Sequence, residues 1–300
     1  MGLTNNDTTF LFYSKKLGVS FANTLMLGRL QLYAKKEYIL SCINKFKNNE
    51  KSLDEVVFKD EFSEPLFEIL GAKTINSLDF SDYEKATIIH DLNMPLDKKY
   101  DNSFTAIIDG GTIEHVFNFP VAIKNCMKAL KVGGHYLGIT PANNSMGHGF
   151  YQFSPELFYR IFSEENGFTV KKMFIYASKD NEDAKNWYEI ADPKSVNSRI
   201  MLVNSLPTYL MIIAEKIAEK EIFSITPQQS DYITTWAVSE SIQKNSKAKN
   251  DSTLKFIYRK ILPKRIKTIL RNLYDIYSTQ KTDTDDFGTI NTEHFKKFEL

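Results

Sequence analysis

The sequence predicts a doubly wound α/β fold built on a mostly parallel sheet of seven strands. Short apolar runs of strand length alternate with segments of helical periodicity over residues 20–215, which is the pattern of repeated strand–helix–strand units. The unit with the clearest boundaries is residues 104–141, FTAIIDGGTIEHVFNFPVAIKNCMKALKVGGHYLGITP. Two strand candidates without a helix between them close the region, and they predict an antiparallel strand at the edge of the sheet.

The unit at residues 104–141 predicts where a ligand would bind. Its first strand, 104–108, ends at Asp109-Gly110-Gly111, a helix with Pro120 in its first turn follows, and a second strand spans 135–139. A parallel pair joined in this way is a right-handed crossover, and ligands of such sheets bind beyond the carboxyl ends of the strands. We therefore expect the site among residues 109–115 and in the loop after Pro141.

The other elements follow from the same signals. Apolar runs bounded by turn residues predict strands at 23–28, 72–78, 86–89, 169–177 and 207–214. Apolar residues at helical spacing predict helices at 29–47 and 62–70, a helix beginning at Ser154-Pro155, and a lead-in helix or lid within 1–22. Residues 47–60 read as an exposed loop, and residues 178–206 as a long polar insertion or substrate loop.

Composition excludes several classes of protein. Lys and Arg number 38 against 37 Asp and Glu, which gives a net charge of +1 and no bulk attraction to nucleic acid. The two cysteines, Cys42 and Cys126, are expected to be reduced thiols of a cytoplasmic protein. The first ten residues lack a basic segment followed by an apolar one, so no secretory signal is expected, and the sequence has no run of 18 apolar residues.

Residues 218–300 are expected to form a separate helical extension after a main domain at 1–217. Within it, residues 253–277 interleave basic and apolar side chains and are interrupted by Pro263. One interpretation is a pair of amphipathic helices that packs on the protein or on another subunit. The other is peripheral contact with an anionic membrane surface, such as the inner face of the cell membrane. Residues 244–252 read as a polar linker, and those after Thr279 as a disordered tail.

The residues at the strand ends carry a resemblance to a known family. Gly28, Asp79, Asp91 and Asp109 follow successive strands, and the stretches FTAIIDGGTIEHV and AIKNCMKALKVGGHYLGITP carry a Glu-His-Val and a Leu-Lys-x-Gly-Gly pattern. In these features residues 20–215 resemble class I S-adenosylmethionine-dependent methyltransferases of the type 11 kind. The resemblance implies a Rossmann-like methyltransferase fold and S-adenosylmethionine as cofactor.

The resemblance also implies a role for each strand end. Asp79, beside Phe80, would accept hydrogen bonds from the ribose hydroxyls, and Asp91 would accept one from the adenine amino group, with backbone groups of Leu92 completing the contact. Asp109 and Gly110 would face the methionine part. The alternative for each carboxylate is a cap on a loop or helix, which is common for acidic residues at such positions.

The first loop departs from the family pattern. It reads Leu27-Gly28-Arg29-Leu30-Gln31 and has one glycine where the family has several. Either Arg29 or Gln31 binds the cofactor's carboxylate in place of backbone N–H groups, or the site is altered or lost.

Two histidines are candidate general bases for the acceptor. His148 lies between Gly147 and Gly149 in the loop after the fifth strand, and His115 lies just past the fourth strand. The alternative is an ordinary loop residue for His148 and a packing position for His115. No histidine or cysteine spacing typical of a metal site is present in the sequence, so no metal is expected.

The expected function is O-methylation of a small-molecule or glycan acceptor, in a setting such as polysaccharide biosynthesis. The rival from another class is a non-catalytic protein of the methyltransferase fold that binds a partner through its extension. A nicotinamide-dependent enzyme is disfavoured because the first loop lacks G-x-G-x-x-G. The sequence leaves the acceptor atom and the oligomeric state open.

Overall fold

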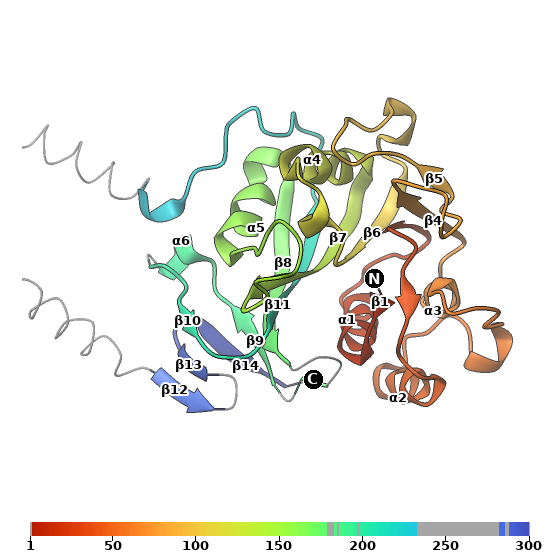
Figure 1. Ribbon diagram of the computed structural model, residues 1–300, viewed down its shortest axis with the longest axis horizontal. Coiled ribbons are helices and arrows are strands. Elements are labelled where there is room, and N and C mark those ends of the chain that lie inside the picture. The colour runs from red at the N-terminus through yellow and green to blue at the C-terminus, as the bar shows by residue number, and fades with distance from the viewer. Residues whose placement is uncertain are drawn as a thin grey trace, which may run out of the picture. The chain divides into compact units, whose positions relative to one another are not determined.

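We analysed a computed structural model of the chain, which describes residues 2–178, 183–184, 186–196, 198–232, 282–285 and 288–299 (Figure 1). The chain divides into two compact units. The first unit comprises residues 1–190, 205–227 and 297–300, and the second comprises residues 191–204 and 228–296. All the candidate site residues belong to the first unit.

A nine-stranded sheet organises the first unit, in the order β14-β9-β8-β11-β7-β6-β2-β4-β5. Its strands are β2 (Asn23–Leu27), β4 (Thr74–Asp79), β5 (Ile88–Ile89), β6 (Phe104–Gly110), β7 (Leu130–Asn143), β8 (Phe168–Ala177), β9 (Trp187–Ile190), β11 (Thr208–Lys216) and β14 (Phe295–Phe298). The neighbours from β5 to β7 are parallel, whereas β11 runs antiparallel to both β7 and β8. The carboxyl ends of five strands therefore meet at one edge of the sheet.

The Rossmann-like α/β fold agrees with the prediction, but three details of the sheet do not. The sheet has nine strands instead of seven, because β9 and β14 extend it. The antiparallel strand β11 lies inside the sheet, between β7 and β8, and not at its edge. The predicted loop at 178–206 contains β9 and a short helix, α6 (Pro193–Val196).

The main helices are α1 (Asn5–Lys16), α2 (Lys36–Phe46), α3 (Glu64–Ile69), α4 (Phe119–Ala129) and α5 (Pro155–Ile161). The structure also has 3₁₀ helices at Leu53–Glu55, Lys98–Tyr100, Ile113–His115 and Glu164–Asn166. The helix predicted at 29–47 is shorter, because β3 (Gln31–Leu32) leaves the loop to pair in parallel with β1 (Gly2–Leu3). Helices α4 and α5 lie on one side of the sheet and α1 on the other (Figure 1).

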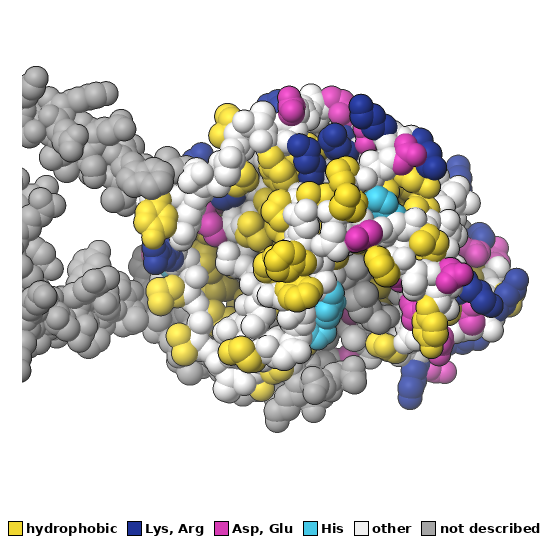
Figure 2. All heavy atoms as spheres, turned by 45° about the horizontal axis from the view of Figure 1, so that its top comes forward, with side chains coloured by type: hydrophobic (Ala, Val, Ile, Leu, Met, Phe, Trp, Pro, Cys, Tyr) yellow, Lys and Arg dark blue, Asp and Glu magenta, His cyan; other side chains and the backbone are white. Residues whose placement is uncertain are grey.

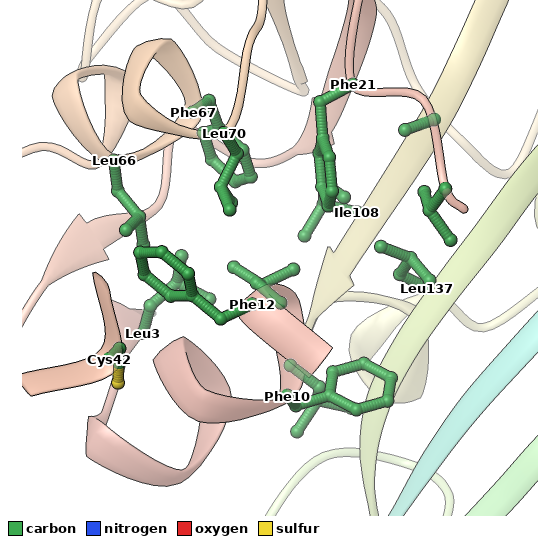
Figure 3. Packing of buried hydrophobic residues seen from close by; sticks show 14 of the residues in the cluster. Leu3, Phe10, Phe12, Phe21, Cys42, Leu66, Phe67, Leu70, Ile108 and Leu137 are labelled. Carbon is green, nitrogen blue, oxygen red and sulfur yellow. The ribbon is translucent and has the colours of Figure 1, made fainter. Parts of the chain in front are cut away.

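Alternation along the strands divides the core into two layers. On the side of α1, α2 and α3, side chains of these helices pack with Met26, Ile108 and Leu137 from the central strands (Figure 3). The intervening strand residues face the other side, where the ring of Tyr136 in β7 lies 5.0 Å from that of Phe162 after α5. A residue's position along β6 or β7 therefore decides the layer in which its side chain lies.

The second unit holds a three-stranded antiparallel sheet in the order β10-β13-β12. Its strands are β10 (Leu202–Val203), β12 (Thr282–Asp285) and β13 (Gly288–Asn291). With β14 they show that the prediction of a disordered tail after Thr279 is wrong for these residues. The basic segment 253–277 and the linker 244–252 lie outside the described residues. Within the described part of the chain, no helix is both long and apolar enough to cross a membrane.

Candidate active site

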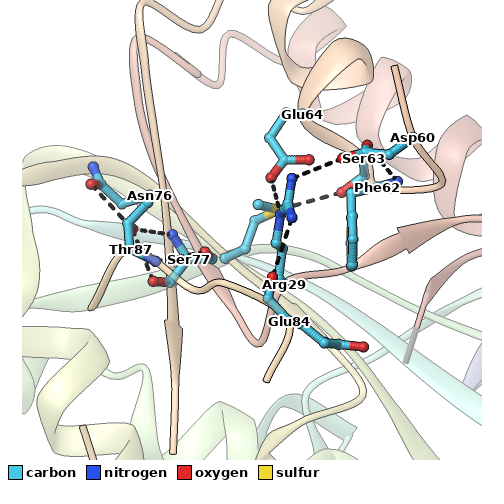
Figure 4. Close-up of polar contacts among 10 residues, drawn as sticks. Arg29, Asp60, Phe62, Ser63, Glu64, Asn76, Ser77, Glu84 and Thr87 are labelled. Atoms are coloured by element: carbon cyan, nitrogen blue, oxygen red, sulfur yellow. Dashed lines mark hydrogen bonds and ion pairs between the residues drawn. The ribbon is translucent and has the colours of Figure 1, made fainter. Parts of the chain in front are cut away.

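Asp79 and Asp91 come together where two neighbouring parallel strands end. Asp79 is the last residue of β4 and pairs with Ile89 of β5, and the backbone N–H of His90 donates to the carbonyl of Asp79 at 2.8 Å. Asp91 is the second residue after β5. Just before β5, Thr87 exchanges backbone and side-chain hydrogen bonds with Ser77 of β4 (Figure 4). These bonds fix β5 against β4, so both carboxylates are held at the same edge of the sheet.

Each carboxylate also makes a local turn contact. Oδ1 of Asp91 accepts hydrogen bonds from the backbone N–H and the side-chain amide of Asn93, at 2.9 and 2.8 Å. The backbone bond from Asn93 lowers the pKa of Asp91 and keeps it ionised. Oδ1 of Asp79 accepts from the backbone N–H of Phe80 at 2.6 Å. Leu92 is buried and Phe80 is exposed. The two half-buried carboxylates can accept hydrogen bonds from a ligand at this edge.

The structure corrects the role proposed for Arg29. Its Nε donates to Glu64 at 2.6 Å, its Nη1 to the backbone carbonyl of Glu84 at 3.2 Å, and its Nη2 pairs with Asp60 at 3.2 Å (Figure 4). The guanidinium also lies 3.8 Å above the ring centre of Phe62. Arg29 therefore joins the first loop to the segment before α3, and its donors are bonded within the chain.

Leucine side chains occupy the space beside the first loop. Leu30 is fully buried, and a Cβ placed on Gly110 would lie 3.0 Å from Leu30 and 3.3 Å from Leu3. Gln31, the other candidate for the cofactor's carboxylate, is bonded to Glu61 and Tyr33. Gly110 thus permits close packing of leucines at the place where the resemblance puts the methionine part. The backbone N–H of Gly28, which has a φ of +74°, donates to the carbonyl of Leu78 at 2.7 Å.

The side chain of Asp109 is directed into the core. Strand β6 continues to Gly110, one pair beyond Asp109, so alternation turns Asp109 toward the layer of Tyr136. Its Oδ1 accepts from the backbone N–H of Thr112 and its Oδ2 from the hydroxyl of Tyr136 at 2.6 Å. Burial raises the pKa of this fully buried carboxyl. The expectation that Asp109 faces the cofactor is therefore wrong for its side chain, because Asp109 lies within β6 and alternation turns it into the core.

Glu114, His115 and His148 form a second cluster at the carboxyl ends of β6 and β7. Nε2 of His148 lies 3.4 Å from Oε1 of Glu114, and the two imidazole rings meet edge to face with 4.8 Å between their centres. Glu114 and His115 belong to the 3₁₀ helix after β6, whereas His148 comes from the loop after β7. The structure thus brings the two predicted histidines together, around a buried glutamate.

The loop that carries His148 is attached to Glu114 by its backbone. The carbonyl of Glu114 accepts from the N–H groups of Phe150 and Tyr151, at 2.8 and 3.3 Å. Gly149 has a φ of +67°, and a Cβ there would lie 2.9 Å from the carbonyl oxygen of Glu114. A glycine is therefore required for this approach. The side-chain carbonyl of Gln152 accepts from the N–H of Ser145 at 2.9 Å and closes the loop.

The charges of this cluster depend on the buried carboxyl. Burial, with a smaller contribution from the charge of Asp109, raises the pKa of Glu114 to about 8. Burial and then the neighbouring His148 lower the pKa of His115. At neutral pH the raised pKa favours the protonated carboxyl of Glu114, and the lowered pKa favours the neutral imidazole of His115. Both neutral groups can exchange protons with a bound molecule.

Two residues of the site were not predicted in their roles. Glu114 entered the sequence analysis only through the Glu-His-Val pattern, although it is the buried centre of the histidine cluster. Tyr136 was not singled out, although its place in β7 opposite Ile107 puts it in the layer that receives Asp109. Alternation along β6 and β7 was the signal that could have found it.

Comparison with known proteins gives similarities of fold. No protein-family model matches the sequence, and no curated protein is significantly similar to it. One similar solved structure is the branched-chain polyamine synthase of Thermus thermophilus, determined with N4-aminopropylspermidine and 5′-methylthioadenosine. It is 12% identical, with a TM-score of 0.37, over 76% of this chain and 62% of that one. The chain therefore spans less than two thirds of the synthase.

Two further similar structures are described as methyltransferases. A putative methyltransferase from Bacillus halodurans is 11% identical over 69% of this chain and 99% of that one, with a TM-score of 0.36. An S-adenosylmethionine-dependent methyltransferase from Aquifex aeolicus is 11% identical over 68% and 87%, with a TM-score of 0.34. At these identities and TM-scores we transfer no activity or substrate, and the functional proposal rests on the chain's own residues.

Proposed function

We propose that the chain is an S-adenosylmethionine-dependent methyltransferase that binds the adenosine half of the cofactor across the ends of β4 and β5. The observation that carries the proposal is the pair of carboxylates, Asp79 and Asp91, at adjacent parallel strand ends. One carboxylate can accept hydrogen bonds from two vicinal ribose hydroxyls, and the second can accept from the adenine amino group. The backbone of Leu92, directly after Asp91, can complete the contact with the base.

The histidine cluster supports an acceptor site at the same edge of the sheet. His148 is 52% exposed beside the buried Glu114, so an acceptor hydroxyl can reach its imidazole and transfer a proton to it. The rings of Phe117 and Phe150 lie 5.7 Å apart in this loop region, and both are exposed. Hydrophobic side chains gather on one face of the molecule, with histidines among them (Figure 2). Exposed rings of this kind can stack on the apolar face of a sugar or small molecule, which favours O-methylation of such an acceptor.

A second function is favoured by the packing of the first loop. Leu30 and Leu3 occupy the space beside Gly110, and Arg29 is bonded within the chain. A methyltransferase-fold protein that has lost the methionine part of its cofactor site would show the same packing. Such a protein would act by binding a partner. The predicted partner or membrane contact of residues 253–277 lies outside the described residues and stays a prediction.

Isothermal titration of the full chain with S-adenosylhomocysteine distinguishes the two functions. The methyltransferase is expected to bind it, and Asp79→Ala is expected to weaken binding by roughly 10- to 100-fold, because charge-assisted hydrogen bonds to the ribose are lost. Asp101→Ala is the matched control, since it removes an exposed carboxylate before β6, at the opposite edge of the sheet. No binding by the wild type at millimolar ligand would support the non-catalytic function. Binding that Asp79→Ala leaves unchanged would refute the adenosine site.

A further inference from the structure

The cluster of Glu114, His115 and His148 has the composition of a metal centre. The ligand atoms of the three side chains, two imidazole nitrogens and one carboxylate oxygen, all lie within 4.8 Å of one another. Glu114 and His115 are adjacent on a 3₁₀ helix, whereas His148 comes from a separate loop. Spacing in the sequence therefore does not reveal these three ligands together. The expectation of no metal site rested on such spacing alone.

The distances are close to those that an ion requires. Four ligands around Zn²⁺ at about 2.0–2.1 Å lie roughly 3.4 Å from one another in tetrahedral geometry. The separation between Oε1 of Glu114 and Nε2 of His148 is 3.4 Å. The other ligand atoms lie within 4.8 Å, and both histidines are exposed, so their rings have room to turn toward the carboxylate.

The carboxylate at the centre of the cluster is an independent sign of a cation-binding site. The side chain of Glu114 is fully buried, and its Oε1 accepts no hydrogen bond within the described part of the chain. Its other oxygen, Oε2, lies 3.4 Å from the hydroxyl of Thr140, which is placed to donate to it. A buried carboxylate oxygen without a donor is costly unless a cation or a proton satisfies it. The oxygen without a donor, Oε1, is the one that lies beside His148.

The backbone around the cluster is built to hold the three groups together. The N–H groups of Phe150 and Tyr151 donate to the carbonyl of Glu114, which fixes the loop of His148 against the 3₁₀ helix. A Cβ on Gly149 would collide with that carbonyl. A Cβ on Gly111 would lie 3.2 Å from Oε1 of Glu114. Gly111 thus lies against the carboxylate and Gly149 against the backbone of Glu114, so both permit close packing around this residue.

We propose that Glu114, His115 and His148 bind a divalent transition-metal ion of the Zn²⁺ type. Two imidazoles and one carboxylate select such ions over Mg²⁺ and Ca²⁺, which prefer sets of oxygen ligands. Three protein ligands leave at least one position for an oxygen from water or a ligand. The exposed imidazoles place this open position toward solvent.

The site would give the acceptor's oxygen a place to bind, and this step alone rests on the proposed methyltransferase function. With its imidazole bound to the ion, His148 is a ligand and not the base. An acceptor hydroxyl at the open position loses its proton to water instead, more readily because the cation stabilises the oxyanion. The oxygen then forms a bond to the methyl carbon as the carbon–sulfur bond of S-adenosylmethionine breaks. The products are the methyl ether, neutral S-adenosylhomocysteine and the released proton.

The test is metal binding by the full chain, freed of any histidine tag and stripped of metal with a chelator. Titration with ZnCl₂ is followed by calorimetry, and titration with CoCl₂ by the visible absorption of the bound ion. We expect one site per chain. His148→Ala, at an exposed position, should preserve the fold and weaken Zn²⁺ binding by at least about tenfold. Glu114→Gln keeps the shape of the buried side chain and should have a similar effect.

His90→Ala is the matched control, because His90 lies outside the cluster and its ring contacts the carbonyl of Met94. It should leave Zn²⁺ affinity unchanged. Absence of Zn²⁺ binding at millimolar metal would overturn the proposal, and so would binding that His148→Ala and Glu114→Gln both leave intact. S-adenosylhomocysteine is titrated in parallel. Failure of the cofactor proposal then appears as absent nucleoside binding, and failure of the metal proposal as absent Zn²⁺ binding.

Discussion

The hydroxyl of Tyr136 in β7 donates a 2.6 Å hydrogen bond to Oδ2 of Asp109 in the neighbouring strand β6. Both side chains are fully buried. Backbone N–H groups after β6 donate to the other oxygen of the carboxyl group. The pair therefore joins the two central strands to the turn that carries Glu114 and His115, and Asp109 supports the site instead of contacting a ligand.

Tyr136→Phe is expected to destabilise the fold. The change leaves a buried oxygen of Asp109 without its donor, which costs about 1–3 kcal/mol. Urea unfolding of the two proteins measures this difference. Tyr83→Phe, at a position that is 89% exposed, is the matched control and should unfold as the wild type does. Equal stability of wild type and Tyr136→Phe would contradict the assignment.

Arg29→Ala is expected to lower the free energy of unfolding by about 1–3 kcal/mol, because removal of the partly buried guanidinium leaves its acceptors unpaired. Arg29→Lys should restore only part of the loss, since an ammonium cannot reproduce the planar contacts with Glu64, Asp60 and the Phe62 ring. Thermal unfolding monitors both variants. Lys51→Ala breaks an exposed pair with Glu68 and serves as control. A free, ligand-binding Arg29 would instead show no stability change.

Gly149→Ala and Gly147→Ala form a matched pair in the loop of His148. Alanine at 149 is strained by the positive φ and meets the carbonyl of Glu114, whereas a Cβ at 147 has no neighbour within 4 Å. We expect Gly149→Ala to cost about 1 kcal/mol or more and to weaken Zn²⁺ binding, because His148 moves away from Glu114. Gly147→Ala should do neither. Equal effects of the two changes on unfolding and on metal titration would show that the loop is not fixed through Gly149.

His148→Ala should leave the affinity for S-adenosylhomocysteine within about twofold of the wild type, because the adenosine site lies at β4 and β5. Asp79→Ala should show the opposite behaviour, with weakened nucleoside binding and normal Zn²⁺ binding. Calorimetric titration of each variant with S-adenosylhomocysteine and with Zn²⁺ gives the four affinities to compare. A loss of nucleoside binding in His148→Ala would mean that the adenosine site at β4 and β5 and the histidine cluster after β6 and β7 form a single site.

Asp7 gives a pH dependence of stability that is independent of the site. Burial outweighs the hydrogen bonds from Thr4 and raises the pKa of Asp7 in the folded chain. The stability that follows from the raised pKa is fully present below the unfolded value of about 3.9, and it is lost as pH rises through the folded value. Asp7→Asn should therefore lose less stability than the wild type as pH is raised from the acid range.

Urea unfolding at a series of pH values measures the difference between wild type and Asp7→Asn. Asp101→Asn, which replaces an exposed carboxylate, is the control and should follow the wild type at every pH. Parallel curves for wild type and Asp7→Asn would show that the pKa of Asp7 is the same in the folded and unfolded chain.

The sequence was sufficient to predict the parts of the fold that local signals determine. The strands around Asp79 and Asp91 were predicted because short apolar runs end there at turn residues, and the parallel order then placed both carboxylates at one edge. Asp109 was misplaced because pairing of Gly110 with Ile139 extends β6 by a step that no local signal marks. Within a strand the alternation of faces continues, and at Asp109 it selects the buried layer that contains Tyr136.

The histidine cluster shows what local patterns cannot provide. The contact between Glu114 and His148 depends on a loop that returns to the 3₁₀ helix and on the positive φ of Gly149. The burial of Leu30 depends likewise on pairing between β1 and β3, which are far apart in the sequence. Such contacts between distant segments are visible only in three dimensions, whereas the glycines that permit them are visible in the sequence.

The internal position of β11 has a consequence for the order in which the chain can fold. Strand β8 is made before β11 but joins the sheet through it, because β11 lies between β7 and β8. While the chain is being synthesised, β7 and β8 therefore each keep an unpaired edge until residue 216 has emerged from the ribosome. Exposed edges of apolar strands invite pairing with other chains. A chain truncated before β11 should consequently aggregate, even though every strand of the nucleoside-binding half is already present.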